Sequence, residues 1–138
     1  SNVSAVQRQQ AEALLKAVGH TLWVEDETKM DAITAISGSG PAYVFYLIEA
    51  MQDAAVALGF SPEQARMLSL QTFAGASQLA IQGEDSVEEL RHKVTSKGGT
   101  TERAILSMEA AEIKRIIAEA ANAAAHRSKE LGDQLGAN

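Results

Sequence analysis

The sequence predicts an all-α protein, a helical bundle that carries one short strand near its N-terminus. Three observations support this fold class. The 138 residues are 46% hydrophobic but only 4% aromatic, and the abundant alanine favours helices and lets them approach closely. Apolar residues recur at helical spacing between Gly and Pro punctuation. Two Ser-x-x-Gln/Glu patterns, at Ser61–Gln64 and Ser86–Glu89, are typical of helix N-termini. The length suits one ordinary domain plus a fragment of another.

The first 29 residues read as a helix, a strand and a linker. Residues 3–18 are amphipathic, and Gly19 is suited to end that helix. The β-favouring run Thr21–Glu25 predicts a strand. A single strand has no ladder partner for its backbone groups. Either two copies pair across a dimer, or the rest of a sheet lies outside this chain. A polar linker follows, and we place the domain boundary near Met30, giving units 1–29 and 30–138.

The next segment predicts two long helices. Residues 31–36 suit a short helical turn, and the run 37–41 (SGSGP) is expected to break regular structure and to place Pro41 at the start of a helix. That helix runs to about Leu58 and is apolar nearly all round, so it should be buried on most sides. In so short a chain, such burial indicates a second subunit. A second helix is expected from Pro62 to a stop at Gly83.

The remaining elements are a short helix and a long one. The capping pattern at Ser86 predicts a helix to about Lys93. A single helix is expected from Thr101 to about Leu131, ended by Gly132. Its apolar stripe consists of Ile105, Met108, Ile113, Ile116, Ile117, Ala120, Ala123 and Ala124.

Composition excludes several classes of function. The formal charge of −6 argues against nucleic acid as a partner, because phosphate binding requires a basic face. The absence of cysteine excludes disulfides and thiolate chemistry and permits a cytoplasmic location. No apolar run approaches the roughly 20 residues of a membrane span. His20, His92 and His126 are scattered, so no metal site is expected.

The most informative stretch is Val94–Ala104 (VTSKGGTTERA), a hydroxyl-rich turn that opens into a helix. Adjacent glycines permit positive φ angles, and such a turn can direct successive N–H groups at one anion. The first turn of the following helix adds unpaired N–H groups and the positive end of its dipole. Basic residues gather just before it, at Arg91, His92, Lys93 and Lys97. The pattern favours a site for a small carboxylate or phosphate; the alternative is an ordinary helix-to-helix loop.

Two motifs resemble the pyrroline-5-carboxylate reductase family. One is residues 94–101 (VTSKGGTT), followed by Ala104 and Met108-Glu109, and the other is residues 30–43 (MDAITAISGSGPAY). The resemblance extends from about Val3 across the chain. It implies the C-terminal helical domain of the family, which dimerises by interleaving helices. The residues before Met30 would then be the last helix and strand of a dinucleotide-binding domain that is otherwise absent. One departure is Lys97, where the family usually has proline.

The resemblance also implies a reaction, the reduction of 1-pyrroline-5-carboxylate to L-proline, the last step of proline biosynthesis. NADPH or NADH would be bound mainly by the absent domain, so no residue of this chain is assigned to the cofactor. We expect the N–H groups of Gly98, Gly99, Thr100 and Thr101 to hold the substrate carboxylate. The resemblance places Thr101 at the substrate's ring nitrogen as the catalytic residue, with Ser96 beside it. The partners would be a cyclic imino acid and a second copy of the chain, with higher assembly open.

Two alternatives remain at this point. The chain could be a non-catalytic helical dimerisation module, with the glycine turn only a tight loop. It could also be the helical half of another NAD(P)-dependent dehydrogenase that pairs a dinucleotide domain with a dimerising one.

Overall fold

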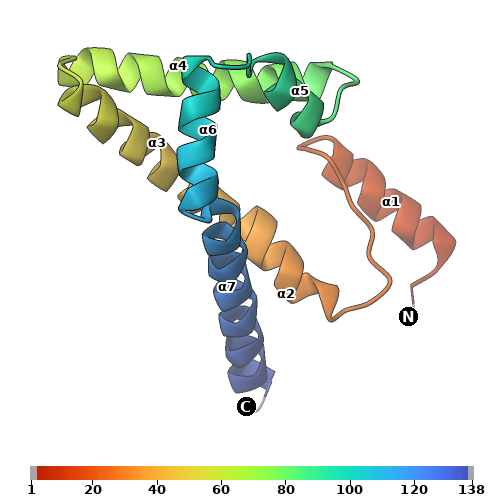
Figure 1. The fold of residues 1–138 in the computed structure, drawn as a ribbon. Coiled ribbons are helices and arrows are strands. Elements are labelled where there is room, and N and C mark those ends of the chain that lie inside the picture. The colour runs from red at the N-terminus through yellow and green to blue at the C-terminus, as the bar shows by residue number, and fades with distance from the viewer. Residues whose placement is uncertain (1–2, 137–138) are drawn as a thin grey trace. The chain divides into compact units, whose positions relative to one another are not determined.

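The computed structural model describes residues 3–136, which form seven α-helices and one π-helical turn (Figure 1). The chain divides into two compact units, with the boundary between Met30 and Asp31. Among residues 3–136, every helix is too short or too polar to cross a lipid bilayer.

The first unit contains α1 (Ala5–Lys16) and an extended tail. Ser4 caps α1 through a capping box with Gln7. The strand predicted at Thr21–Glu25 is not formed, since the described residues contain no β-ladder. The physical reason is that the hydrogen bonds of a strand need a neighbouring strand, and residues 3–136 supply none.

Helix α2 (Lys29–Ile33) spans this boundary, and the second unit continues in series with the π-helical turn η1 (Thr34–Gly38) and α3 (Gly40–Ala57). The break expected at residues 37–41 is therefore wrong in part, because the chain stays helical through Gly38. Pro41 has no N–H to give to a carbonyl one turn back. The wider turn changes the hydrogen-bond register instead, and Ser39 N–H donates to the Thr34 carbonyl at 2.8 Å.

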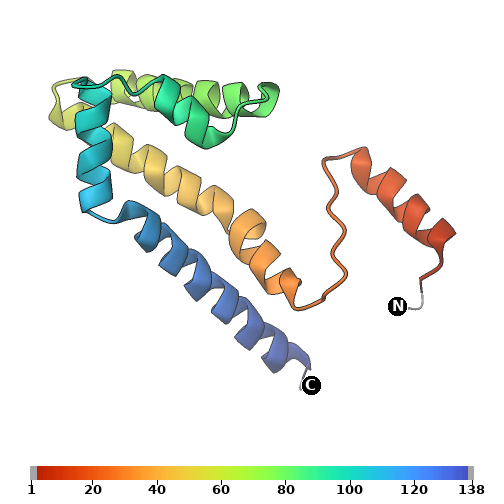
Figure 2. The same cartoon turned by 45° about the vertical axis from the view of Figure 1, so that its right-hand side comes forward.

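Helices α3 and α4 (Pro62–Gln82) form a packed pair joined by a tight turn at Gly59 (Figures 1 and 2). Ala65 and Ser69 lie one helical turn apart on α4, and both are buried, as is Ile48 of α3. Small residues on one face of α4 allow close helix packing. The capping box predicted at Ser61 and Gln64 is present.

The chain then forms α5 (Val87–Lys93), α6 (Thr100–Ala110) and α7 (Ile113–Gly136). The single long helix expected from Thr101 to Leu131 is thus wrong. It breaks at Ala111–Glu112, where Glu112 takes φ 53°, and α7 continues past Gly132. After the break, α7 runs antiparallel alongside η1 and α3 (Figure 2). It covers Ala35 of η1, and the Ser128 hydroxyl donates to Asp31 Oδ1 at 2.7 Å.

Candidate functional site: a glycine turn between two helices

The predicted anion-binding turn lies between the end of α5 and the start of α6. Helix α5 is closed by the Thr95 side chain, whose hydroxyl donates to the Arg91 carbonyl at 2.6 Å. The Thr95 N–H donates to the His92 carbonyl at 3.1 Å. The next residues, Ser96 to Gly99, form the turn itself, and α6 begins at Thr100. All five predicted site residues (Ser96, Gly98, Gly99, Thr100 and Thr101) therefore lie in one short segment.

The two glycines are needed for different reasons. Gly98 has φ +74°, in the left-handed region that side chains rarely adopt. Gly99 has an ordinary φ of −82°, but a Cβ there would meet Ser96 Oγ at 2.7 Å and the Ser96 carbonyl oxygen at 3.0 Å. The first glycine supplies a backbone conformation, and the second permits a close approach of the chain to itself.

Two of the four predicted N–H donors already have acceptors within the chain. The Gly98 N–H donates to Glu102 Oε2 at 2.7 Å, and the Gly99 N–H donates to the Ser96 carbonyl at 3.0 Å. Thr100 and Thr101 are the first two residues of α6, where backbone N–H groups have no partner inside the helix. In the described part of the chain, these two N–H groups have no acceptor outside the helix either, so they are open to a ligand.

Helix α6 begins without a capping side chain, because its N-cap residue is Gly99. Helices α1, α4 and α5 each begin with a serine whose hydroxyl accepts a backbone N–H. Thr101 is the second residue of α6 and half-buried. The ordinary structural role for a threonine at a helix start is to cap the first N–H groups with its hydroxyl. Thr101 does not have this role, because the N-cap position belongs to Gly99.

The basic residues near the turn are mostly paired with carboxylates. Lys93 Nζ lies 2.6 Å from Asp85 Oδ2, and Arg91 lies 3.9 Å from both Glu88 and Glu109. His92 Nε2 is 3.7 Å from Glu88. In the described part of the chain, Lys97 is the one member of this group without a carboxylate partner. The local positive charge is therefore smaller than the sequence suggests.

Sequence reasoning missed Glu102 as part of this turn. A Glu at the third helical position commonly reaches back to a backbone N–H before the helix. Glu102 holds that position relative to the N-cap Gly99, and it reaches one residue further, to Gly98. The spacing was visible in the sequence, but the Ser/Thr that usually begins such a pattern is replaced here by glycine.

A second feature of this unit is an apolar groove between α3 and α7. Its volume is about 260 Å³, and its lining consists of Tyr43, Tyr46, Leu47, Ile113, Ile116, Ile117 and Ala120. The Tyr43 hydroxyl is buried without a hydrogen-bond partner among the described residues. Phe45 and Tyr46 of α3 are 68% and 72% exposed. The helix that the sequence expects to be buried all round thus leaves much apolar surface uncovered within this chain.

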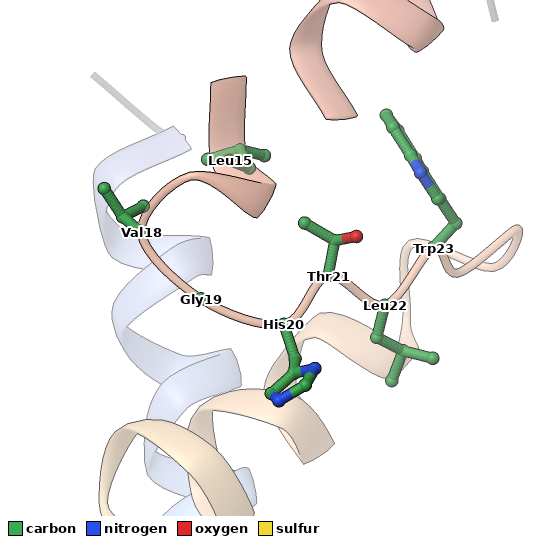
Figure 3. A pocket seen from close by; sticks show the side chains of 7 residues that line it. All are labelled: Leu15, Val18, Gly19, His20, Thr21, Leu22 and Trp23. Atoms are coloured by element: carbon green, nitrogen blue, oxygen red, sulfur yellow. The ribbon is translucent and has the colours of Figure 1, made fainter. Parts of the chain in front are cut away.

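The first unit has a shallow hollow of about 410 Å³ at the end of α1 (Figure 3). It contains none of the predicted site residues. Figure 3 shows Thr21 and Trp23 pointing to one side of the extended segment and His20 and Leu22 to the other, as in a strand. The Thr21 hydroxyl is buried and has no hydrogen-bond partner among residues 3–136, and Arg8 stacks on the Trp23 ring at 4.4 Å.

Comparison with known proteins identifies the family. The model of the pyrroline-5-carboxylate reductase dimerisation family matches residues 27–131. The chain belongs to this family. It is 52% identical over 136 residues, 99% of its length, to pyrroline-5-carboxylate reductase of Pseudomonas aeruginosa, of which it covers 50%. It is 42% identical over 131 residues, 94% of its length, to the enzyme of that name from Haemophilus influenzae, covering 48% of it.

Solved structures of the family agree with this assignment. Pyrroline-5-carboxylate reductase from Coxiella burnetii superimposes with a TM-score of 0.91 at 44% identity, covering 95% of this chain and 48% of that one. Pyrroline carboxylate reductase from Plasmodium falciparum, solved with NADP bound, superimposes with a TM-score of 0.85 at 33% identity. The match covers 96% of this chain and 50% of that one. The chain thus spans about half the length of the relatives that it matches. The family expected from the two sequence motifs is confirmed.

Proposed function

We propose that the full-length protein is a pyrroline-5-carboxylate reductase, which reduces the cyclic imine 1-pyrroline-5-carboxylate to L-proline with NADPH or NADH. The observation that carries the proposal is family membership over residues 27–131, together with relatives of that name matched over nearly the whole chain. The nicotinamide supplies the hydride when it is bound. This chain provides the helical half, and we assign the cofactor's binding to the other half of the protein. A cytoplasmic location belongs to the same proposal and is testable by cell fractionation.

We assign residues 1–29 to the last helix and strand of the dinucleotide-binding domain. The side chains of His20 to Trp23 alternate from one side of the extended segment to the other, as in a strand (Figure 3). Within the described residues, the buried Thr21 hydroxyl has no hydrogen-bond partner. Both features are expected at a sheet edge whose neighbouring strand lies outside this chain. In the full-length protein this segment should gain ladder hydrogen bonds, which slow amide exchange would reveal.

We propose that the helical unit forms a homodimer by interleaving helices. The support is the exposed apolar surface of α3 and the groove that α3 forms with α7. Monomeric proteins rarely expose large contiguous apolar patches. A Phe45→Asp substitution should shift full-length protein toward monomer in sedimentation velocity. Lys129→Glu, an exposed charge reversal on α7, is the control and should leave the dimer intact; equal dimerisation of both variants would place the interface elsewhere.

For the substrate, we assign the carboxylate to the N–H groups of Thr100 and Thr101 at the start of α6. An anion there complements the helix dipole and satisfies first-turn donors. Gly98 and Gly99 contribute by shaping the turn, since their own N–H groups have acceptors within the chain. Lys97, exposed beside the turn, adds a positive charge where the family usually has proline.

We assign the Thr101 hydroxyl to the substrate's ring nitrogen, with Ser96 alongside Thr101. Hydride transfer to a C=N bond requires the substrate carbon to be held in a fixed pose. A hydroxyl can orient the protonated imine by hydrogen bonding, while its high pKa makes it a weak acid. Most of the rate enhancement from this half of the site would therefore come from positioning.

The test uses full-length protein and the variants Thr101→Ala and Thr101→Ser. Thr101→Ala should lower kcat/KM for the imine by roughly 10- to 100-fold, the loss of one well-placed hydrogen bond. Thr101→Ser keeps the hydroxyl and should stay within a few-fold of wild type. The KM for the dinucleotide should be unchanged in both. An unchanged kcat/KM in Thr101→Ala would remove Thr101 from the site.

A further inference from the structure

Glu102 places a carboxylate inside the turn that we assign to the substrate. It is the third residue of α6 and half-buried, and its Oε2 accepts the Gly98 N–H at 2.7 Å. A hydrogen bond to an ionised acceptor at this length is among the stronger kinds in proteins. It joins the left-handed residue of the turn to the first turn of the helix that follows.

This bond closes the turn from one side, and a backbone bond closes it from the other. The Gly99 N–H donates to the Ser96 carbonyl at 3.0 Å, which folds the turn back on itself. The two bonds hold the N–H groups of Gly98 and Gly99, and Thr100 and Thr101 follow directly in the chain.

Resting on the proposed function, we propose that Glu102 is a positioning residue, which holds the Gly98 N–H and thereby directs the N–H groups of Thr100 and Thr101 at the substrate carboxylate. Glu102 also removes Gly98 from the set of donors that a ligand can reach. The carboxylate subsite thus has fewer N–H donors than the glycine motif alone implies. Rigid placement of donors before the ligand arrives reduces the ordering cost of binding.

The Glu102 carboxylate could instead have the opposite effect and weaken substrate binding. A negative charge close to the bound substrate carboxylate repels it, and removal of Glu102 would then tighten binding. The two roles predict opposite changes in the KM for the imine. Measurement of that KM therefore decides between them.

The experiment uses full-length protein with the variants Glu102→Ala, Glu102→Gln and, as control, Glu109→Ala. Glu109 lies on the same helix and is exposed, and its carboxylate approaches Arg91 at 3.9 Å rather than the turn. Glu102→Ala should raise the KM for the imine roughly tenfold and change kcat and the dinucleotide KM by less than about twofold, because it removes one charge-assisted bond that orders the turn. Glu102→Gln retains an acceptor oxygen and should recover most of the affinity. Glu109→Ala should behave as wild type.

Amide exchange of Gly98, followed by NMR on glycine-labelled full-length protein, gives a readout independent of turnover. The Gly98 amide should exchange faster in Glu102→Ala than in wild type or Glu109→Ala. An unchanged or lowered KM in Glu102→Ala, in an enzyme whose wild type reduces the imine, would overturn the positioning role alone. A wild type that does not reduce the imine would overturn the proposed function, and unchanged Gly98 exchange would show that the bond is not formed.

Discussion

A methyl group added at Gly99 tests the geometry of the turn directly. In Gly99→Ala the new Cβ would lie 2.7 Å from Ser96 Oγ and 3.0 Å from the Ser96 carbonyl oxygen, whereas ordinary contact begins at 3.4 Å. The hydroxyl can rotate away, but the carbonyl belongs to the backbone. The turn must therefore open by about 0.4 Å, the difference between 3.4 Å and 3.0 Å. Overpacking costs about 1–3 kcal/mol, and an exposed turn that can relax should lie near 1 kcal/mol.

That opening moves the peptide that carries the Thr100 N–H, so it should also weaken substrate binding. A loss of about 1.4 kcal/mol corresponds to a factor of ten, and we expect the KM for the imine to rise by about that factor in full-length Gly99→Ala. Steady-state kinetics with varied imine and saturating dinucleotide measures it.

Gly132→Ala is the matched control, because Gly132 lies within α7 and a Cβ there meets nothing within 4 Å. It should leave the KM unchanged and raise stability slightly, since alanine favours helix over glycine by about 1 kcal/mol. If Gly99→Ala leaves both the KM and the thermal midpoint at wild-type values, the close approach of Gly99 to Ser96 does not constrain the site.

Three further predictions concern the helical unit and use the midpoint of thermal unfolding. Glu112→Gly should stabilise by about 0.5–1 kcal/mol, because glycine relieves the left-handed φ of 53° at the loss of only exposed ion pairing; a lower midpoint would contradict this. Ser128→Ala should destabilise by about 1–2 kcal/mol, because it removes the half-buried 2.7 Å bond to the Asp31 carboxylate, and an unchanged midpoint would show that water replaces it. Hydrogen bonds from the Ser86 side chain and backbone hold the pKa of Glu89 below its ordinary value of 4.5. This stabilisation is present above the ordinary value and is lost as pH falls through the lowered pKa, so Ser86→Ala should reduce the acid-side loss of stability; the same acid profile in wild type and variant would contradict it.

Local signals in the sequence were enough to predict where most helices begin and end. Ser61 and Ser86 mark helix starts because the cap and its partner lie three residues apart, and the structure forms both boxes. Gly59 and Gly83 mark the helix ends: Gly59 takes φ +99° just after α3, and Gly83 is the C-cap of α4, with its N–H on the Leu79 carbonyl. Interactions of this range do not depend on the rest of the fold.

The breaks in helices that the sequence did not predict depend on tertiary packing. Ala111 and Glu112 are adequate helix formers, and no Gly or Pro announces the turn there. One signal existed: Met108 and Ile113 lie five apart in an apolar stripe that otherwise repeats at three and four. That change of phase is what two packed helices joined by a turn would produce.

The glycine turn was predictable in position, and its hydrogen bonds only in part. Adjacent glycines before a helix locate the turn, but which N–H groups remain available depends on where Glu102 places its carboxylate. Side-chain placement of that kind is not encoded in spacing alone. The same holds for the basic residues before the turn, most of which are paired with carboxylates.

The most direct test of the central proposal is a crystal structure of the full-length protein with L-proline, the proposed product. The carboxylate oxygens should accept the N–H groups of Thr100 and Thr101, with the ring nitrogen beside the Thr101 hydroxyl. The Gly98 N–H should remain on Glu102. Proline bound away from the start of α6, or bound there with the Thr101 hydroxyl turned away from the ring nitrogen, would contradict the assignment of this turn as the substrate site.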